Sequence, residues 1–366
     1  MKLVLCTLCL KSRSAVSQKT SKLKSPEQNS GQRLEDSQSD THQSMANHTG
    51  FILLGFPNIA EKFDIPVSVA LFLVYLASFF SNGTVIALII CNRKLYQPMY
   101  VVILNLAISD LLFDTVTLPK IIAKYWFDGG SISFAGCIFQ VFCAHFLGSF
   151  DSYILLLMAI DRYVAICKPL RYPSIITNRR TILLCCMLWC LTVVIALVIA
   201  LLDSNIPFCG ENRIRSCFCT NTGVLFLACR DVTVLKRIIF GIAMFVLLLP
   251  LAFILFSYGV IIKVVISQTQ TDSRRKAFYT CATHLSVICL YFIPRIFVYV
   301  ANQFNLILNE DVNVLILCLY TFVPHMANPI IYCLRTKEIR RTLRNLIKKR
   351  ILMKTQHIVV INAVAK

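Results

Sequence analysis

The chain has 366 residues, of which 57% are hydrophobic and 15% are charged, and its formal net charge is +19. Soluble domains are nearer half apolar and one quarter charged, so this composition excludes an ordinary water-soluble protein. The basic residues flank apolar segments and do not form one face, which argues against a nucleic-acid-binding protein.

The first 44 residues differ from the rest of the chain. The stretch 19–43 is rich in Ser, Gln, Lys and Asp, so we expect residues 1–44 to form a disordered extension. The opening MKLVLCTLCL resembles a weak signal sequence, although we favour Met45 as the true start of translation. Residues 45–65 are then a short extracellular N-terminus, and Asn47 begins a glycosylation sequon within it.

Seven apolar segments follow, each long enough to cross a membrane. A hydrocarbon core about 30 Å thick needs about 20 apolar residues per helix, and lipid offers unpaired backbone groups no partner, so each segment must be helical. The segments are Pro66–Cys91, Met99–Ala123, Ile138–Arg162, Thr181–Leu202, Ile238–Ile262, Ala282–Val300 and Val312–Leu334. We therefore predict an all-α seven-transmembrane helix bundle over residues 66–335, with a tail at 336–366.

The distribution of Lys and Arg sets the expected orientation. With the N-terminus outside, the inner segments and the tail hold more than half of the basic residues. This predicts a multi-pass plasma-membrane protein with a cytoplasmic C-terminus. In the tail, apolar residues from Ile339 to Leu352 are spaced on one side of a helix among Lys and Arg. That pattern predicts a short amphipathic helix on the anionic inner leaflet.

Most of the 17 cysteines lie inside the spans, where they act as small apolar residues. The exceptions are Cys209, Cys217, Cys219 and Cys229 in one outer loop, and Cys137 at the outer end of the third span can reach them. Disulfides are permitted on that side of the membrane. The residues alone leave their connectivity open.

Ionisable residues inside spans are costly and usually have a function. Asp110, midway along the second span, is either a cation or proton site or a structural hydrogen-bond hub with Asn82 and Asn328. Asp161 and Arg162 end the third span. They can hold an ion pair that opens when a partner protein docks, or the arginine simply reaches the membrane surface.

Further polar residues lie in the outer and middle parts of the bundle. His145 and Asp151 do not share a helical face, and His145 either contacts a ligand or satisfies a neighbouring helix. Arg295 in the sixth span is a candidate anion site together with Lys120 and Lys124. In the alternative interpretation, Arg295 reaches the outer loop or water and binds nothing.

Prolines inside the spans predict bent helices, which suit a bundle with two discrete arrangements. They are Pro119, Pro250, Pro294, Pro324 and Pro329.

A series of short strings follows the spans in order. They are LLGFP at 53–57, PMY at 98–100, LAISD at 106–110, MAIDRYVAIC at 158–167 with KPLRY at 168–172, SY at 257–258, KAFYTCATHL at 276–285 and NPIIYCLR at 328–335. Together they resemble the odorant (olfactory) receptor family of rhodopsin-like G-protein-coupled receptors, over about residues 45–350.

The resemblance implies roles for the matching residues. The inner switch that meets the G protein would comprise Asp161, Arg162, Tyr163, Tyr258 and Tyr332. The polar core would comprise Asn82, Asp110, Asn328 and Pro329. The implied disulfides are Cys137–Cys219 and Cys209–Cys229, which leaves Cys217 without a partner.

The aquatic-type class of the family is favoured by Gln140, His145, Ser152 and Pro294, which match its pattern. The chain departs from the family at Asp151, where glutamate is usual, at Phe292, where tyrosine is usual, and at Ile160, where an aromatic residue is usual. The ligand-binding candidates are His145, Asp151, Phe292 and Arg295.

The implied function is that of an odorant receptor. A small, water-soluble ligand binds in the outer half of the bundle, and a stimulatory G protein of the olfactory type then raises cyclic AMP. We expect no cofactor, no metal and no nucleic-acid partner. One alternative is a receptor for a non-olfactory ligand. Another is a transporter or channel, which often shows an even span count or repeated halves; this sequence shows neither, nor a nucleophile–base set typical of an enzyme.

Overall fold

The computed structural model describes residues 50–209, 212–267, 271–304, 306, 309–335 and 339–345. Among these, the side chains of residues 94, 271–280, 283 and 332–335 lie outside the description. The predicted extension and the sequon at Asn47 fall outside the described residues.

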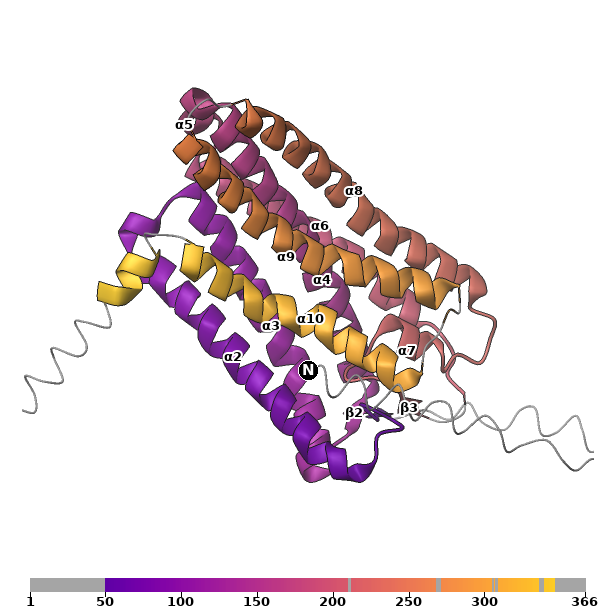
Figure 1. Ribbon diagram of the computed structural model, residues 1–366. Helices are drawn as coiled ribbons and strands as arrows, with labels where there is room; N and C mark the ends of the chain where they lie inside the picture. The colour runs from indigo at the N-terminus through magenta and orange to yellow at the C-terminus, as the bar shows by residue number, and fades with distance from the viewer. Residues whose placement is uncertain are drawn as a thin grey trace, which may run out of the picture. The chain divides into compact units, whose positions relative to one another are not determined.

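The described residues hold seven helices that are long and apolar enough to cross a membrane (Figure 1). They are α2 (Asp64–Cys91), α3 (Pro98–Phe127), α4 (Phe134–Cys167), α6 (Asn178–Ser204), α8 (Thr233–Ile266), α9 (Thr271–Gln303) and α10 (Glu310–Arg335). Each contains one predicted span and extends it at one or both ends. The predicted all-α seven-helix bundle is therefore confirmed.

Local sequence signals set several helix ends. Ser133 and Thr177 cap α4 and α6, because their side-chain oxygens accept hydrogen bonds from backbone N–H groups of the first turn. Pro98 starts α3, where a missing N–H costs nothing. Asp128 ends α3 with a left-handed φ of 50°, and its N–H bonds the Ala123 carbonyl.

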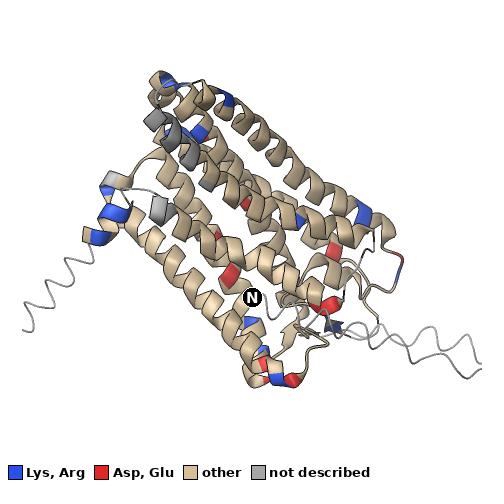
Figure 2. Cartoon of the chain, in the orientation of Figure 1, with Lys and Arg blue, Asp and Glu red and all other residues tan. Residues whose placement is uncertain are grey.

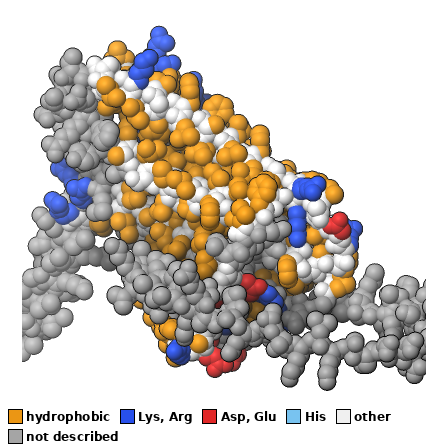
Figure 3. Space-filling model, turned by 45° about the vertical axis from the view of Figure 1, so that its right-hand side comes forward, with side chains coloured by type: hydrophobic (Ala, Val, Ile, Leu, Met, Phe, Trp, Pro, Cys, Tyr) orange, Lys and Arg blue, Asp and Glu red, His pale blue; other side chains and the backbone are white. Residues whose placement is uncertain are grey.

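The helices pack around α4, which contacts α3, α6 and α8. The α2 helix packs on α3 and α10, and α9 packs on α8 and α10. The outward faces of the helices carry large apolar side chains, among them Phe80 and Phe253. Figure 3 shows this apolar surface along the flank of the bundle, with charges gathered near its ends. Such a surface fits lipid and not water.

The five prolines lie inside helices as predicted: Pro119 in α3, Pro250 in α8, Pro294 in α9, and Pro324 and Pro329 in α10.

A small sheet, which the sequence did not predict, covers one end of the bundle. Strand β1 (Gly50–Leu53) lies between β2 (Ser131–Ser133), with which it is antiparallel, and β3 (Arg213–Ile214), with which it is parallel. Gly50 faces Ser133, and a Cβ there would lie 2.5 Å from the Ile132 carbonyl oxygen, so this close approach requires glycine. We call this end of the bundle the cap end.

Short elements complete the chain. They are the 3-10 helices η2 (Glu61–Phe63), η3 (Arg93–Leu95) and η4 (Pro169–Arg171), and the helices α5 (Tyr172–Ile175) and α7 (Asn221–Leu225). Residues 339–345 are also helical. Ile339 is buried against the main core, and Asn92 donates a 3.1 Å hydrogen bond to Thr342. This is the described part of the predicted amphipathic helix, and we call this end of the bundle the tail end.

Candidate functional site

The polar core lies in the middle of the bundle, where Figure 2 shows acidic residues as short red segments on helices that are mostly uncharged. Asn328 of α10 donates a 3.0 Å hydrogen bond to the Asp110 carboxylate of α3. Asn82 of α2 donates to Ser78 and to the His325 carbonyl, each at 3.1 Å. The hub expected around Asp110, Asn82 and Asn328 thus spans three helices, with Asn82 joined to it through α10.

His325, which the sequence analysis missed, lies at the centre of this core. Its Nδ1 is 2.7 Å from Asp114 Oδ1, and its Nε2 is 3.7 Å from Asp110 and 3.9 Å from Asp151. All four side chains are almost completely buried. Ser78 bonds Asp114, and Ser109 donates a 2.7 Å hydrogen bond to Asp151. One imidazole therefore ties α10 to carboxylates of both α3 and α4.

Three of these residues form a group that could hold a cation. Asp110, Asp151 and His325 each offer one ligand atom, and these atoms lie within 4.8 Å of one another. Two carboxylates and an imidazole suit small cations. The group matches the cation-or-proton interpretation of Asp110, while the expected lack of a metal stays a prediction.

Arg295 of α9 is buried near the polar core, with only 6% of its surface exposed. Its guanidinium lies 4.2 Å from the Tyr291 ring centre and 5.6 Å from that of Tyr320. Its Nη1 donates to the Tyr291 hydroxyl at 3.2 Å, and that hydroxyl in turn donates to the Gly148 carbonyl of α4. Its Nε has no hydrogen-bond acceptor. Within the described residues, no carboxylate lies within ion-pair distance of this cation.

The other ligand-binding candidates take different positions. Asp151 belongs to the polar core, Phe292 is fully buried with its ring 4.9 Å from Tyr291, and His145 is half-buried. Lys124 lies over the Tyr125 ring at 4.0 Å. No described contact joins Lys120 or Lys124 to Arg295, so the structure does not assemble the three cations into one site.

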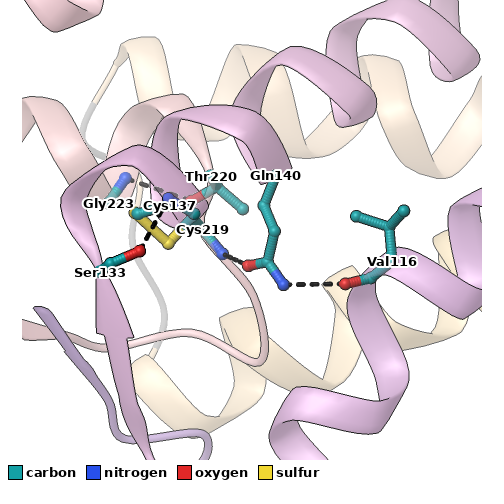
Figure 4. Close-up of a disulfide and its surroundings, with 8 residues drawn as sticks. Val116, Ser133, Cys137, Gln140, Cys219, Thr220 and Gly223 are labelled. Carbon is teal, nitrogen blue, oxygen red and sulfur yellow. Dashed lines mark hydrogen bonds between the residues drawn. A yellow bond between two sulfur atoms is a disulfide. The ribbon is translucent and has the colours of Figure 1, made fainter. Parts of the chain in front are cut away.

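The loop between α6 and α8, which we call the lid, is fastened to the cap end. Disulfides Cys137–Cys219 and Cys209–Cys229 are both present, as the family resemblance implied. Gln140 of α4 accepts a 3.0 Å hydrogen bond from the Cys219 N–H and donates a 2.9 Å bond to the Val116 carbonyl of α3 (Figure 4). One amide therefore fixes the lid to two helices.

Lid residue Phe218 inserts into the bundle beside this anchor. Its ring lies 5.7 Å from Phe113 of α3 and 6.2 Å from Phe322 of α10. The Phe113 ring lies 5.3 Å from His325. A continuous chain of aromatic contacts thus connects the lid with the polar core.

Cys217, expected to have no partner, lies against Cys318 of α10. The two sulfur atoms are 3.2 Å apart and both side chains are buried. Both are free thiols in the structure, so Cys217 has no disulfide partner, as expected. The sequence did not predict that the fold would bring a cysteine of the seventh span against it.

The residues expected to form the inner switch lie at the tail end. Arg162 Nη2 is 3.6 Å from the Asp161 carboxylate, which accepts a 2.8 Å hydrogen bond from the Tyr172 hydroxyl. Burial and the nearby Asp161 carboxylate raise the pKa of Tyr172 well above its usual value, so the phenol remains a donor. Tyr258 bonds His284 of α9. Tyr163 is partly buried against the core, while the Tyr332 side chain lies outside the described residues.

Sequence reasoning missed several residues that complete these sites. Asp114 lies one helical turn after Asp110, and His325 lies one turn before Asn328. Helical spacing places each beside a predicted core residue, so both could have been found. Tyr291 and Tyr172 gave no such signal, because a tyrosine in a span or loop is common.

Comparison with known proteins agrees with this architecture. The family model for the olfactory receptor matches residues 71–350. Olfactory receptor 52B2 of Homo sapiens is 35% identical over 306 residues, which is 82% of this chain and 93% of the relative. Olfactory receptor 1E16 of Mus musculus is 38% identical, and olfactory receptor 1 of Rattus norvegicus is 37% identical; each match covers 82% of this chain and 95% of the relative.

These matches do not bear out the narrower expectation of the aquatic-type class. The family model covers most of the spans and the relatives match over nearly their whole length, so the chain belongs to the olfactory receptor family.

Proposed function

We propose that this receptor binds a small, water-soluble odorant in the cap-end half of the bundle and activates a stimulatory G protein of the olfactory type, which raises cyclic AMP. In this proposal the cap end faces the outside of the cell and the tail end faces the cytoplasm. Two disulfides at the cap end support that orientation, because disulfides persist in oxidising compartments. The basic residues of the tail end support it as well.

Arg295 is the observation that carries the ligand proposal. A buried charge is normally paired, because its desolvation costs several kcal/mol. This guanidinium contacts two tyrosine rings and donates one hydrogen bond to a phenol hydroxyl, while its Nε has no acceptor. An incoming carboxylate would supply the missing acceptor and the missing charge. We therefore favour small anionic odorants, with a guanidinium–carboxylate contact as the main polar interaction.

The contacts of Arg295 suggest how binding is transmitted. Its partner Tyr291 is bonded to the Gly148 carbonyl of α4, one turn before Asp151 of the polar core. A ligand that pulls on Arg295 therefore shifts α9 against α4. The ligand activates the receptor only if it binds one arrangement of the bundle more tightly than the other. Each difference of about 1.4 kcal/mol in binding free energy shifts the ratio of the two arrangements tenfold. At the tail end, the Asp161–Arg162 pair then opens to admit the G protein.

A cyclic-AMP assay tests this proposal in cells that express the full chain with the olfactory G protein. The ligands are short carboxylates and the alcohols of matched length. We compare wild type with Arg295→Gln and with Lys120→Gln, a matched loss of a cation that the structure places outside the Arg295 contacts. Surface labelling of each variant controls for expression.

We expect carboxylates to raise cyclic AMP in wild type and Lys120→Gln, and at least tenfold higher concentrations to be needed in Arg295→Gln. A response to the alcohols alone, equal in wild type and Arg295→Gln and with no response to carboxylates, would support the receptor and refute the anion site. A ligand that binds the wild type without raising cyclic AMP would refute the coupling.

A further inference from the structure

The sulfur atoms of Cys217 and Cys318 are in contact without being bonded, close enough for a disulfide to form with a small movement. Their sulfur atoms are 3.2 Å apart, and a disulfide requires about 2.05 Å, so they need to approach by only about 1 Å. Cys217 belongs to the lid and Cys318 to α10, and 101 residues separate them along the chain. The contact is therefore a product of the fold and not of sequence proximity.

The surroundings of the pair favour the bond over two free thiols. Cys217 is fully buried and Cys318 is 9% exposed, in an apolar cluster with Phe218, Phe113 and Phe322. Cys219, two residues further along, is bonded to Cys137, and Cys209–Cys229 closes the same loop. This part of the chain thus already carries oxidised cysteines.

We propose that Cys217 and Cys318 form a third disulfide, which fastens the lid to the seventh span. The oxidant is a low-molecular-weight disulfide of the secretory compartment. One cysteine loses its proton and attacks that disulfide, which gives a mixed disulfide and releases one small thiol. The other cysteine then displaces the second small thiol. Two protein thiols are oxidised by two electrons, and one small disulfide is reduced to two thiols.

The bond forms while the lid is still closing onto the bundle. Once the lid is seated, both sulfurs are buried, and the hydrogen bond with Cys318 and burial raise the pKa of the Cys217 thiol. A protonated thiol is a poor nucleophile, so later oxidation is slow. The finished bond holds Phe218 between Phe113 and Phe322, and so fixes the aromatic chain that leads to His325.

Differential alkylation of the full-length receptor tests this proposal. Membranes from expressing cells are denatured without reductant in excess N-ethylmaleimide. The protein is then reduced, labelled with an isotopically heavy form and digested. Cys143, a buried thiol of the same apolar cluster that is free within the described residues, serves as the reference for an unpaired cysteine. Cys209 and Cys229 serve as the reference for a paired one.

We expect Cys217 and Cys318 to carry the heavy label, as Cys209 and Cys229 do, and an unreduced digest to contain one peptide that joins them. In Cys318→Ser, the label on Cys217 should change from heavy to light. The proposal is overturned if both cysteines carry the light label while Cys209 and Cys229 carry the heavy one. It is equally overturned if Cys217 is joined to another cysteine. This readout needs no ligand and no G protein, so it stands apart from the proposed function.

Discussion

Replacing Asp114 by Asn tests whether the His325 cluster holds the bundle together. Asp114 is completely buried, accepts a hydrogen bond from Ser78 and lies 2.7 Å from His325 Nδ1. The other two carboxylates near the ring, Asp110 and Asp151, lie at 3.7 and 3.9 Å, beyond hydrogen-bond distance. Asp114 is therefore the principal partner of His325.

The expected magnitude follows from that single bond. A hydrogen bond to a charged group contributes about 1.5–3 kcal/mol, so Asp114→Asn should lower the free energy of unfolding by about 2 kcal/mol. With about 2.1 cal/mol/K of unfolding entropy per residue, a chain of 366 residues should then lose about 3 °C in melting temperature. The assay is thermal unfolding of the purified receptor in detergent.

Asp128→Asn is the matched control for this change. It makes the same substitution at the end of the same helix, at an exposed position with a left-handed φ of 50° that asparagine tolerates. Its melting temperature should stay within about 1 °C of wild type. If Asp114→Asn melts at the same temperature as the wild type, the contact between Asp114 and His325 does not stabilise the bundle. A higher melting temperature would mean that repulsion among the three carboxylates outweighs the bond to His325.

Three further substitutions probe the other contacts. Gly148→Ala places a Cβ 3.0 Å from Arg295 Nη1, so it should lower the free energy of unfolding by about 1–3 kcal/mol and weaken the cyclic-AMP response to carboxylates. Gly241→Ala is the control, because open space surrounds that position, and it should not lower the melting temperature. Gln140→Leu leaves the buried Cys219 N–H without its acceptor and should lower the stability by about 1–3 kcal/mol in the same thermal assay; an unchanged melting temperature would mean that the amide does not hold the lid. Tyr172→Phe removes the 2.8 Å hydrogen bond to Asp161 and should raise ligand-independent cyclic AMP several-fold, while Tyr96→Phe, in an exposed neighbouring loop, should leave it unchanged.

Much of the fold could be predicted from sequence because lipid leaves the backbone few choices. Each apolar run must become a helix, and α2 (Asp64–Cys91) and α6 (Asn178–Ser204) extend the predicted spans by only a few residues. The β1–β2–β3 sheet could not be predicted. Its strands are very short and pair segments that are distant in the sequence, so no alternating pattern marks them.

Part of the site could also be predicted, because lipid makes a charged side chain in a span conspicuous. Asp110 and Arg295 stood out because a charge in a span is costly, and the structure places both in the buried interior. His325 was not singled out, because a histidine in a span is not counted among the charged residues, although it lies nearest to the carboxylates. Cys318 resembled any small apolar residue of a span until the fold placed it 3.2 Å from Cys217. The role of a side chain whose partner is distant in the sequence cannot be predicted until the fold shows that partner.

We propose that ligand binding at the cap end opens the tail end to a G protein. Nucleotide exchange measures this most directly, with purified full-length receptor in lipid nanodiscs, the stimulatory olfactory G protein and a carboxylate that the cell assay has identified. We predict that the ligand accelerates exchange at least several-fold on wild type, and that Arg162→Ala, which removes the 3.6 Å pair with Asp161, abolishes the acceleration while ligand binding is retained. A ligand that binds the wild type and leaves the exchange rate unchanged would contradict the account.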